Sequence, residues 1–455
     1  MTAAHPGVAS RRILLILTEF APSFGGMQTH ASYLARHLCE RGYQVLVLTY
    51  RATDPAHAAA CAAHDAACGY PVRRVLSRIG HWHNIQLVRQ WQQAFAPDLV
   101  YASNVYYGLL RHGPGPQGGA PILARCVGND VMRPWIAYPF RFASRAVSHP
   151  WVERHLVQQF RRWNMPEWVE RVLRTQRVRL MQQSARQLTH VLANSAYTAQ
   201  ALAQSGVARE RVQVLVGGVD AARFRPQGHG AQAAGAQAIR RRLGLPGSGR
   251  LLLTACRLVP KKGLDFLLAQ MPALLRQHPD LHLVVIGEGR EQARCQAQAG
   301  ALGVQARVHF VGRVAHEQIH LYYWCADVFV LASRVVHSRW GGFKDAETMG
   351  RVLCEANAAG VPVLASLSGG IPSVVRHEDN GLLFGEDDGA DFQLQLARLL
   401  RDDALRRQLV ARGLATAQSQ FDWATIIAAH EHAFARALGG SGHPQLPANA
   451  LQAGA

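Results

Sequence analysis

The chain has 455 residues, 49% of them hydrophobic and 17% charged, which is enough for two or three domains with substantial cores. This composition excludes a small disulfide-stapled scaffold and a largely disordered chain. With 49 Lys and Arg against 30 Asp and Glu, the net charge of +19 favours anionic partners: nucleic acid, an anionic membrane surface or phosphorylated substrates.

The N-terminal half alternates short apolar runs with helical stretches. The runs lie at 12–17, 44–49, 98–102, 121–126 and 190–194, and they are typical of buried parallel strands. A helical stretch follows Gly25 and Gly26 and ends at Gly42, which completes a βαβ unit between the first two runs. This half is therefore predicted to form a doubly wound α/β domain.

A second series of strand-like runs predicts a second domain of the same kind. These runs lie at 250–255, 281–287, 307–312, 327–333 and 361–366. A Gly-, Pro- and Ala-rich stretch places the boundary near residue 220, and helical patterns follow at 391–419 and 423–437. We expect domains at 1–220 and 221–420, a helix at 421–438 that packs back towards the first domain, and a flexible tail at 439–455.

The cysteines and the N-terminus indicate a cytoplasmic protein. The eight cysteines are scattered, mostly in apolar runs, which is typical of buried thiols in a reducing compartment. Cys61, His64 and Cys68 do not have a recognised zinc spacing, so no metal site is predicted there. The first apolar stretch is too short for a signal peptide, and no run approaches the roughly 20 apolar residues of a membrane span.

Two carboxylates bracket the most informative segment, which runs from Glu347 to the end of a helix predicted over 350–359. Glu347 precedes this helix and Glu355 lies within it, so the two can flank a ligand at the helix N-terminus. The backbone N–H groups of 348–352 and the helix dipole would suit a diphosphate there. The alternative is that both glutamates are ordinary helix residues, although a buried Glu355 would need a partner, such as a ligand hydroxyl.

Basic residues and glycines supply further candidate phosphate contacts. Arg257, Lys261 and Lys262 follow a strand at the sheet edge where open α/β sheets bind ligands, unless they form a solvated basic loop. Gly25 and Gly26 would let the backbone approach a phosphate, unless they form a plain turn. The chain has neither a G-x-G-x-x-G fingerprint nor a Walker loop.

Together these pieces resemble the retaining family-4 glycosyltransferases of GT-B fold, over roughly residues 12–437. The matching segments are Gly-Gly at 25–26, VLVGGVDAARFRP at 214–226, Arg257 with Lys262, and ETMGRVLCEANAAGVPVLASLSGGIPSVV at 347–375. The last segment carries the Glu-x7-Glu signature of the family. The resemblance implies two Rossmann-like domains facing across a cleft and transfer of a sugar from a nucleotide-sugar donor to a glycan or lipid-linked acceptor, in bacterial cell-surface polysaccharide or lipopolysaccharide synthesis.

The resemblance also implies roles for single residues. Arg257 and Lys262 would hold the diphosphate and neutralise the leaving group, Glu347 would contact the donor sugar, and Glu355 would contact the ribose. The donor would further be bound by the segment between the glutamates and by the glycine pair across the cleft: Thr348, Met349, Gly350, Arg351, Val352, Gly25 and Gly26. Neither a metal nor a cofactor is expected, because the two cations supply the positive charge and the sequence has no Asp-x-Asp motif.

Two departures from the family pattern bear on the acceptor side. Many relatives carry a His-Asp pair after the fifth strand, whereas this chain has Asn129 and Asp130. Asp130 becomes the candidate for a sugar-hydroxyl contact, with helix capping as the alternative. A long stretch at 334–346 could shape donor or acceptor choice through His337 and Lys344, unless it is simply a surface loop.

The positive charge is concentrated at 133–186, where eleven Arg accompany three Glu and many aromatic residues. This density predicts contact with an anionic leaflet, and hence a peripheral position on the inner face of the cell membrane. A plain solvated face and a nucleic-acid patch are the alternatives, but no nucleic-acid-binding module is present. Rival functions are another GT-B chemistry, such as a phosphorylase or sugar-nucleotide epimerase, and a basic nucleic-acid-binding scaffold.

Overall fold

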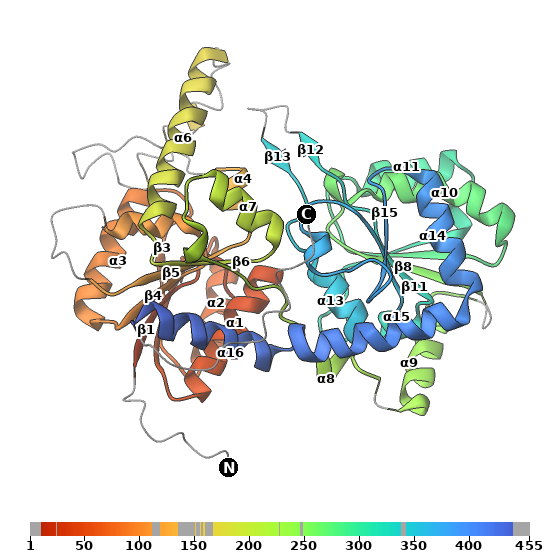
Figure 1. Cartoon of the computed structure of the whole chain (residues 1–455), viewed down its shortest axis with the longest axis horizontal. Helices are drawn as coiled ribbons and strands as arrows, with labels where there is room; N and C mark the ends of the chain where they lie inside the picture. Colours follow the sequence, from red (N-terminus) through yellow and green to blue (C-terminus); the bar gives the residue numbers. More distant parts are fainter. Residues whose placement is uncertain are drawn as a thin grey trace.

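The computed structural model describes residues 11–23, 25–111, 119–134, 151, 155, 158–159, 167–226, 228–245, 249–337 and 343–439. Two parallel β-sheets lie side by side, each covered by helices (Figure 1). This is the α/β architecture of two Rossmann-like domains that the sequence predicts. None of the described helices is both long enough and apolar enough to cross a bilayer.

The first sheet has seven strands in the order β3-β2-β1-β4-β5-β6-β7. The strands are β1 (Arg12–Ile16), β2 (Gln44–Tyr50), β3 (Val72–Leu76), β4 (Leu99–Ala102), β5 (Ile122–Cys126), β6 (His190–Ala193) and β7 (Val212–Val214). The helices are α1 (Gly26–Glu40), α2 (Pro55–Ala66), α3 (His81–Phe95), α4 (Asn129–Met132), α6 (Glu167–Gln187) and α7 (Ala196–Gln204). All five predicted runs are strands. The strand β3 was not predicted, because Arg73 and Arg74 interrupt its apolar pattern.

The second sheet has six strands in the order β10-β9-β8-β11-β14-β15. The strands are β8 (Leu251–Ala255), β9 (His282–Ile286), β10 (Val308–Gly312), β11 (Val328–Leu331), β14 (Val363–Ser366) and β15 (Leu382–Phe384). The helices before the C-terminal segment are α8 (Ala221–Phe224), α9 (His229–Arg242), α10 (Leu264–Gln277), α11 (Gln292–Ala301), α12 (Ile319–Cys325) and α13 (Arg351–Ala358). A two-stranded hairpin, β12 (Val336–His337) and β13 (Lys344–Asp345), rises beside this sheet. The short edge strand β15 was not predicted.

The C-terminal segment begins on the second sheet and ends on the first (Figure 1). The helical pattern at 391–419 forms α14 (Gly389–Arg401) and α15 (Asp403–Thr416), which separate at Asp402 because its carboxylate accepts the Leu405 N–H at 2.9 Å. After a π-helical turn, α16 (Trp423–Ala437) packs against α1, with the Trp423 ring stacked on Tyr33 at 4.6 Å between centroids.

The chain crosses between the two sheets at two adjacent places. Val219, which follows the first sheet, forms a parallel bridge with Asp422, which precedes α16. Gly218 beside it has φ 103°, and a Cβ atom there would lie 2.7 Å from the Trp423 ring. Only glycine combines this backbone conformation with this contact. The two crossings therefore form a single paired connection between the domains.

Residues after the strands of the two sheets meet. The Asn194 amide, which follows β6, donates to the Thr348 hydroxyl at 3.1 Å. The Ala196 N–H donates to the Ser373 hydroxyl at 2.9 Å. In open α/β sheets, ligands bind outside the carboxyl ends of the strands. The site predicted from the sequence therefore belongs where these ends approach one another.

Candidate active site

Lys262 and Glu347 form an ion pair within the second domain. Lys262 ends the 3-10 turn that follows β8, Glu347 lies just before α13, and the Lys262 ammonium donates to Glu347 Oε2. Each side chain is only 11% exposed. Burial alone would raise the pKa of Glu347, but the adjacent Lys262 outweighs it and holds that pKa below its ordinary value. The pair is therefore charged on both sides at neutral pH.

Glu355 is buried and already has partners in its own domain. Its Oε2 accepts the Tyr323 hydroxyl at 2.9 Å, and its Oε1 lies 3.4 Å from Arg351 Nε. Burial, together with the charge of Glu355, raises the pKa of Tyr323, so this hydroxyl stays protonated and donates. The partner that a buried Glu355 was expected to need is thus supplied within the protein, by Tyr323 and Arg351, and not by a ligand hydroxyl alone.

The segment between the two glutamates forms the N-terminus of α13, as expected. The helix is one residue shorter at each end than predicted, with Gly350 at the N-cap in the left-handed region (φ 84°). Met349 Sδ accepts the Gly217 N–H at 3.3 Å, and the Val352 carbonyl accepts the Tyr323 hydroxyl at 3.3 Å. Contacts from both the interdomain connection and α12 thus fix this helix N-terminus.

The glycine pair of the first domain faces this helix N-terminus. Gly25 and Gly26 are exposed at the start of α1. A Cβ atom at Gly26 would lie 3.8 Å from Arg351 Nε, on the helix that carries Glu355. The structure therefore brings Gly26 close to Arg351, across the boundary between the two domains.

Arg257 is the exposed cation of the predicted cluster. Arg257 lies shortly after β8, and its positive charge acts to lower the pKa of Lys262. Lys261, by contrast, is buried and paired with Asp345, a residue that was not among the predicted site residues. Of the three neighbouring cations, Arg257 is the one that the structure leaves most open to solvent.

Asp130 does not join this cluster. It is 2% exposed, and its carboxylate accepts the Val105 N–H at 3.1 Å and the Cys126 thiol at 3.1 Å, both in the first domain. Burial raises the pKa of Asp130. The N-cap of α4 is Gly128, so Asp130 is not the helix cap either. A contact between Asp130 and a sugar hydroxyl stays a prediction that this geometry does not favour.

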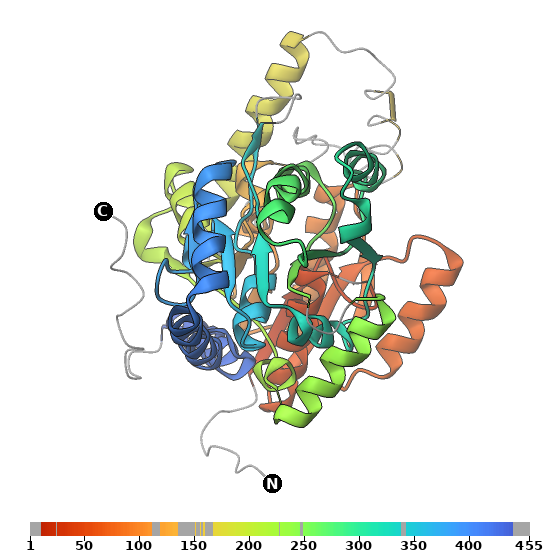
Figure 2. The same ribbon diagram turned by 90° about the vertical axis from the view of Figure 1, so that its right-hand side faces the viewer.

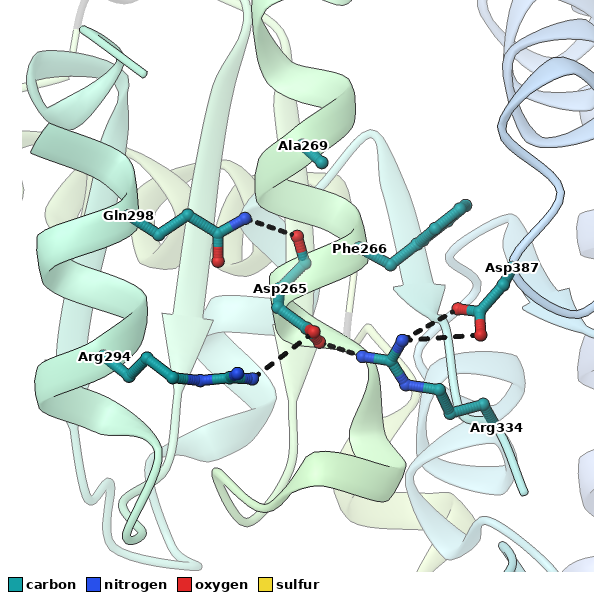
Figure 3. Close-up of a pocket in the computed structure, with 7 residues that line it drawn as sticks. All are labelled: Asp265, Phe266, Ala269, Arg294, Gln298, Arg334 and Asp387. Atoms are coloured by element: carbon teal, nitrogen blue, oxygen red, sulfur yellow. Dashed lines mark hydrogen bonds and ion pairs between the residues drawn. The ribbon is translucent and has the colours of Figure 1, made fainter. Parts of the chain in front are cut away.

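A separate charged cavity lies between α10 and α11, with a volume of about 700 Å³ (Figure 3). Arg334 binds Asp265 there and lies 3.2 Å from Asp387, while Arg294 approaches Asp265 at 3.4 Å. None of the predicted site residues lines this cavity. The acidic and basic groups of this cavity pair with one another. We therefore interpret them as structural ion pairs that hold the chain in place after β11.

Metal-ligating side chains do not gather at this site. Among the described residues, no group of three or more His, Cys, Asp or Glu is arranged to hold a metal ion. All eight cysteines are free thiols.

Residues 24–223 match the family model described as Glycosyltransferase Family 4, and residues 236–415 match that of Glycosyl transferases group 1. The chain belongs to glycosyltransferase family 4. The two matches fall on the two sheets, and the second contains both Lys262 and the Glu-x7-Glu segment. Both matched models describe glycosyltransferases, so this protein is a glycosyltransferase.

Curated relatives of this glycosyltransferase include mannosyltransferases. It is 28% identical to a GDP-mannose-dependent monoacylated alpha-(1-6)-phosphatidylinositol monomannoside mannosyltransferase of Corynebacterium glutamicum, over 91% of this chain and 95% of the relative. It is 34% identical to a GDP-mannose-dependent alpha-(1-6)-phosphatidylinositol monomannoside mannosyltransferase of Mycobacterium tuberculosis, but over only 51% of this chain and 58% of that relative.

Solved structures establish the fold of this glycosyltransferase as GT-B. Anabaena HepE in complex with UDP and glucose matches 92% of this chain and 98% of its own, with a TM-score of 0.64 and 20% identity. WaaG, a glycosyltransferase involved in lipopolysaccharide biosynthesis, matches 94% of this chain and all of its own, with a TM-score of 0.60 and 18% identity.

Proposed function

We propose that this enzyme transfers a sugar from a nucleotide-sugar to a glycan or lipid-linked acceptor with retention of configuration, in bacterial cell-surface glycan synthesis. One observation carries the proposal: the buried Lys262–Glu347 pair lies at the N-terminus of α13, which Gly26 faces from the first domain. A helix N-terminus and neighbouring cations together stabilise a diphosphate as negative charge develops on it.

Each charged group then has a role in the transfer. Lys262 and Arg257 stabilise the departing nucleoside diphosphate, Glu347 contacts the sugar, and Glu355 contacts the ribose. The bond from the anomeric carbon to the phosphate oxygen breaks on the face where the acceptor hydroxyl bonds to that carbon. Because the Asp130 carboxylate is engaged inside the first domain, the leaving phosphate takes the acceptor proton.

The names of relatives suggest which substrates to try first. Two relatives are described as GDP-mannose-dependent enzymes acting on phosphatidylinositol monomannoside, and HepE is described in complex with UDP and glucose. We propose GDP-mannose and UDP-glucose as the first donors to test, and mannosylated or lipopolysaccharide-type glycolipids as the first acceptors.

The test is acceptor-dependent release of nucleoside diphosphate, with the anomeric configuration of the product read by NMR. We expect release only with both substrates, and a product with the donor's configuration. Release that requires inorganic phosphate would indicate a phosphorylase, and conversion of the donor sugar without release would indicate an epimerase. Inversion of configuration would contradict the retaining mechanism.

Transfer is expected to continue in a chelator. Lys262 and Arg257 supply positive charge where a divalent ion acts in other enzymes, so EDTA should leave the initial rate unchanged. The rate is measured before and after EDTA, and again after addition of magnesium or manganese. Loss of activity that either ion restores would show that the cations do not suffice.

We further propose that α6 places the enzyme peripherally on the inner face of the cell membrane. This helix extends away from both sheets in two perpendicular views (Figures 1 and 2). Near its start, Trp168 is 67% exposed and Val172 is 44% exposed, with exposed Arg171 between them. Tryptophan and arginine side by side suit an anionic bilayer interface. Residues 135–150 and several others of the predicted 133–186 region lie outside the described residues.

Charge reversal on α6 is expected to weaken binding to anionic vesicles. Each arginine near a negatively charged leaflet contributes about 1 kcal/mol, so Arg171→Glu with Arg174→Glu should reduce sedimentation with phosphatidylserine vesicles sharply, as should high salt. The control carries the same charge change on the second domain, Arg401→Glu with Arg407→Glu. Equal binding by both double variants would make α6 a solvated face.

A further inference from the structure

Two adjacent lysines hold two acids of one short segment. Lys262 pairs with Glu347, and Lys261 Nζ donates to Asp345 Oδ1 at 2.7 Å and to the Ala346 carbonyl at 3.0 Å. The Lys261 side chain is only 8% exposed. The turn at 260–262 is thus joined to 345–347 by two parallel ion pairs, and only one of them has a role in the proposed chemistry.

Asp345 also faces the first domain. It lies in β13, and its second oxygen, Oδ2, is 3.9 Å from Arg133 Nη1, directly after α4. Arg133 is 58% exposed, so this contact is weak and easily broken, whereas the Lys261 contact is nearly buried. One carboxylate therefore connects the turn that carries Lys262 to the helix after β5 of the opposite domain.

The chain just before the other strand of the hairpin, β12, is fixed to the same turn. The Arg334 N–H donates to the Lys261 carbonyl at 2.8 Å, and its guanidinium Nε donates to the Pro260 carbonyl at 3.3 Å. The same guanidinium is held by Asp265 and Asp387 (Figure 3). Both ends of the hairpin therefore contact the turn at 260–262, one through Asp345 and the other through Arg334. A shift of Asp345 would consequently move the turn that ends in Lys262.

We propose that Asp345 is a positioning residue for sugar transfer. Through its ion pair with Lys261, Asp345 keeps Glu347, two residues further on, next to Lys262. Through Arg133 it aligns α4 of the first domain with the donor site when the domains face one another. The inference rests on the proposed function, because it assigns Asp345 to the step in which the acceptor meets the bound donor.

The test measures kcat, acceptor KM and donor Kd for Asp345→Asn, Arg133→Gln and the double variant. Small misplacements of reacting groups cost up to about 100-fold in rate, so Asp345→Asn should lower kcat by about 10- to 100-fold with donor Kd nearly unchanged. Arg133→Gln should raise acceptor KM or lower kcat modestly, and have no further effect once Asp345 is Asn. Asp345→Glu keeps the charge and should recover part of the rate.

Lys261→Met with Asp345→Asn separates positioning from folding, because it removes both charges of the nearly buried pair and leaves only the exposed Arg133 without this partner. We expect this double variant to melt close to the parent and still transfer slowly. Asp379→Asn, which breaks an exposed ion pair with Arg376, should keep full activity. Unchanged kcat in Asp345→Asn, or full recovery in the Lys261 double variant, would overturn the inference. A parent enzyme that transfers no sugar would contradict the proposed function as well.

Discussion

Lys262→Ala is expected to lower the rate of sugar transfer by about 10²- to 10³-fold, the usual loss when one preorganised electrostatic contact is removed. The same change should lower the melting temperature, because it leaves Glu347 buried without its partner. Breaking a buried ion pair costs about 3–5 kcal/mol. Initial rates at saturating substrate and thermal unfolding measure the two effects separately.

A second variant distinguishes the loss of catalysis from the loss of stability. Lys262→Met with Glu347→Gln removes both charges, so the protein should regain much of its stability and still fail to transfer sugar. Asp327→Asn is a suitable control, since Asp327 approaches Arg240 at the start of β11, the end of the strand away from the site. Transfer at the parent rate by folded Lys262→Ala would refute the role of this lysine.

Glu355→Ala is expected to lower transfer at limiting donor by about 10- to 100-fold, chiefly by weakening donor binding. Glu355 is 3% exposed, and its removal leaves the Tyr323 hydroxyl and Arg351 without their shared acceptor. Hydrogen bonds to a charged group contribute about 1.5–3 kcal/mol each, so donor Kd should rise by about 10- to 100-fold. Isothermal titration with the active donor measures this change.

The matched control for Glu355 is Tyr323→Phe, which removes one hydrogen bond to the carboxylate and keeps the carboxylate itself. Its donor Kd should rise far less than that of Glu355→Ala. If the two variants weaken donor binding equally, Glu355 serves only to hold Tyr323 and the helix. Normal turnover in folded Glu355→Ala would remove this residue from the site.

The fold could largely be predicted from apolar runs, because buried parallel strands are continuous in sequence. The ten predicted strands are all present, and the two omissions are edge strands: β3 contains two arginines, and β15 has only three residues. An edge strand has a neighbouring strand on one side only and is less deeply buried, so its sequence carries a weaker apolar signal. The break between α14 and α15 was also missed, because the capping effect of Asp402 interrupts the chain without interrupting the pattern.

The candidate site was predictable where its residues are close in sequence. Glu347, Glu355 and the segment between them lie together at the start of α13 as expected. Tyr323 was not predictable as a partner of Glu355, since 32 residues separate them and nothing in the spacing joins α12 to α13. The depth of Asp130 was likewise not predictable, because it depends on the backbone of Val105, 25 residues earlier.

Donor binding tests the central claim most directly, because it requires no knowledge of the acceptor. The parent enzyme and Glu355→Ala are each unfolded thermally in the presence of a panel of nucleotide-sugars, including GDP-mannose and UDP-glucose. A ligand that binds only the folded state raises the melting temperature by mass action. We predict that at least one nucleotide-sugar stabilises the parent and that this stabilisation is lost in Glu355→Ala. Stabilisation of the parent by no member of the panel, or equal stabilisation of both proteins, would contradict the assignment of the donor site.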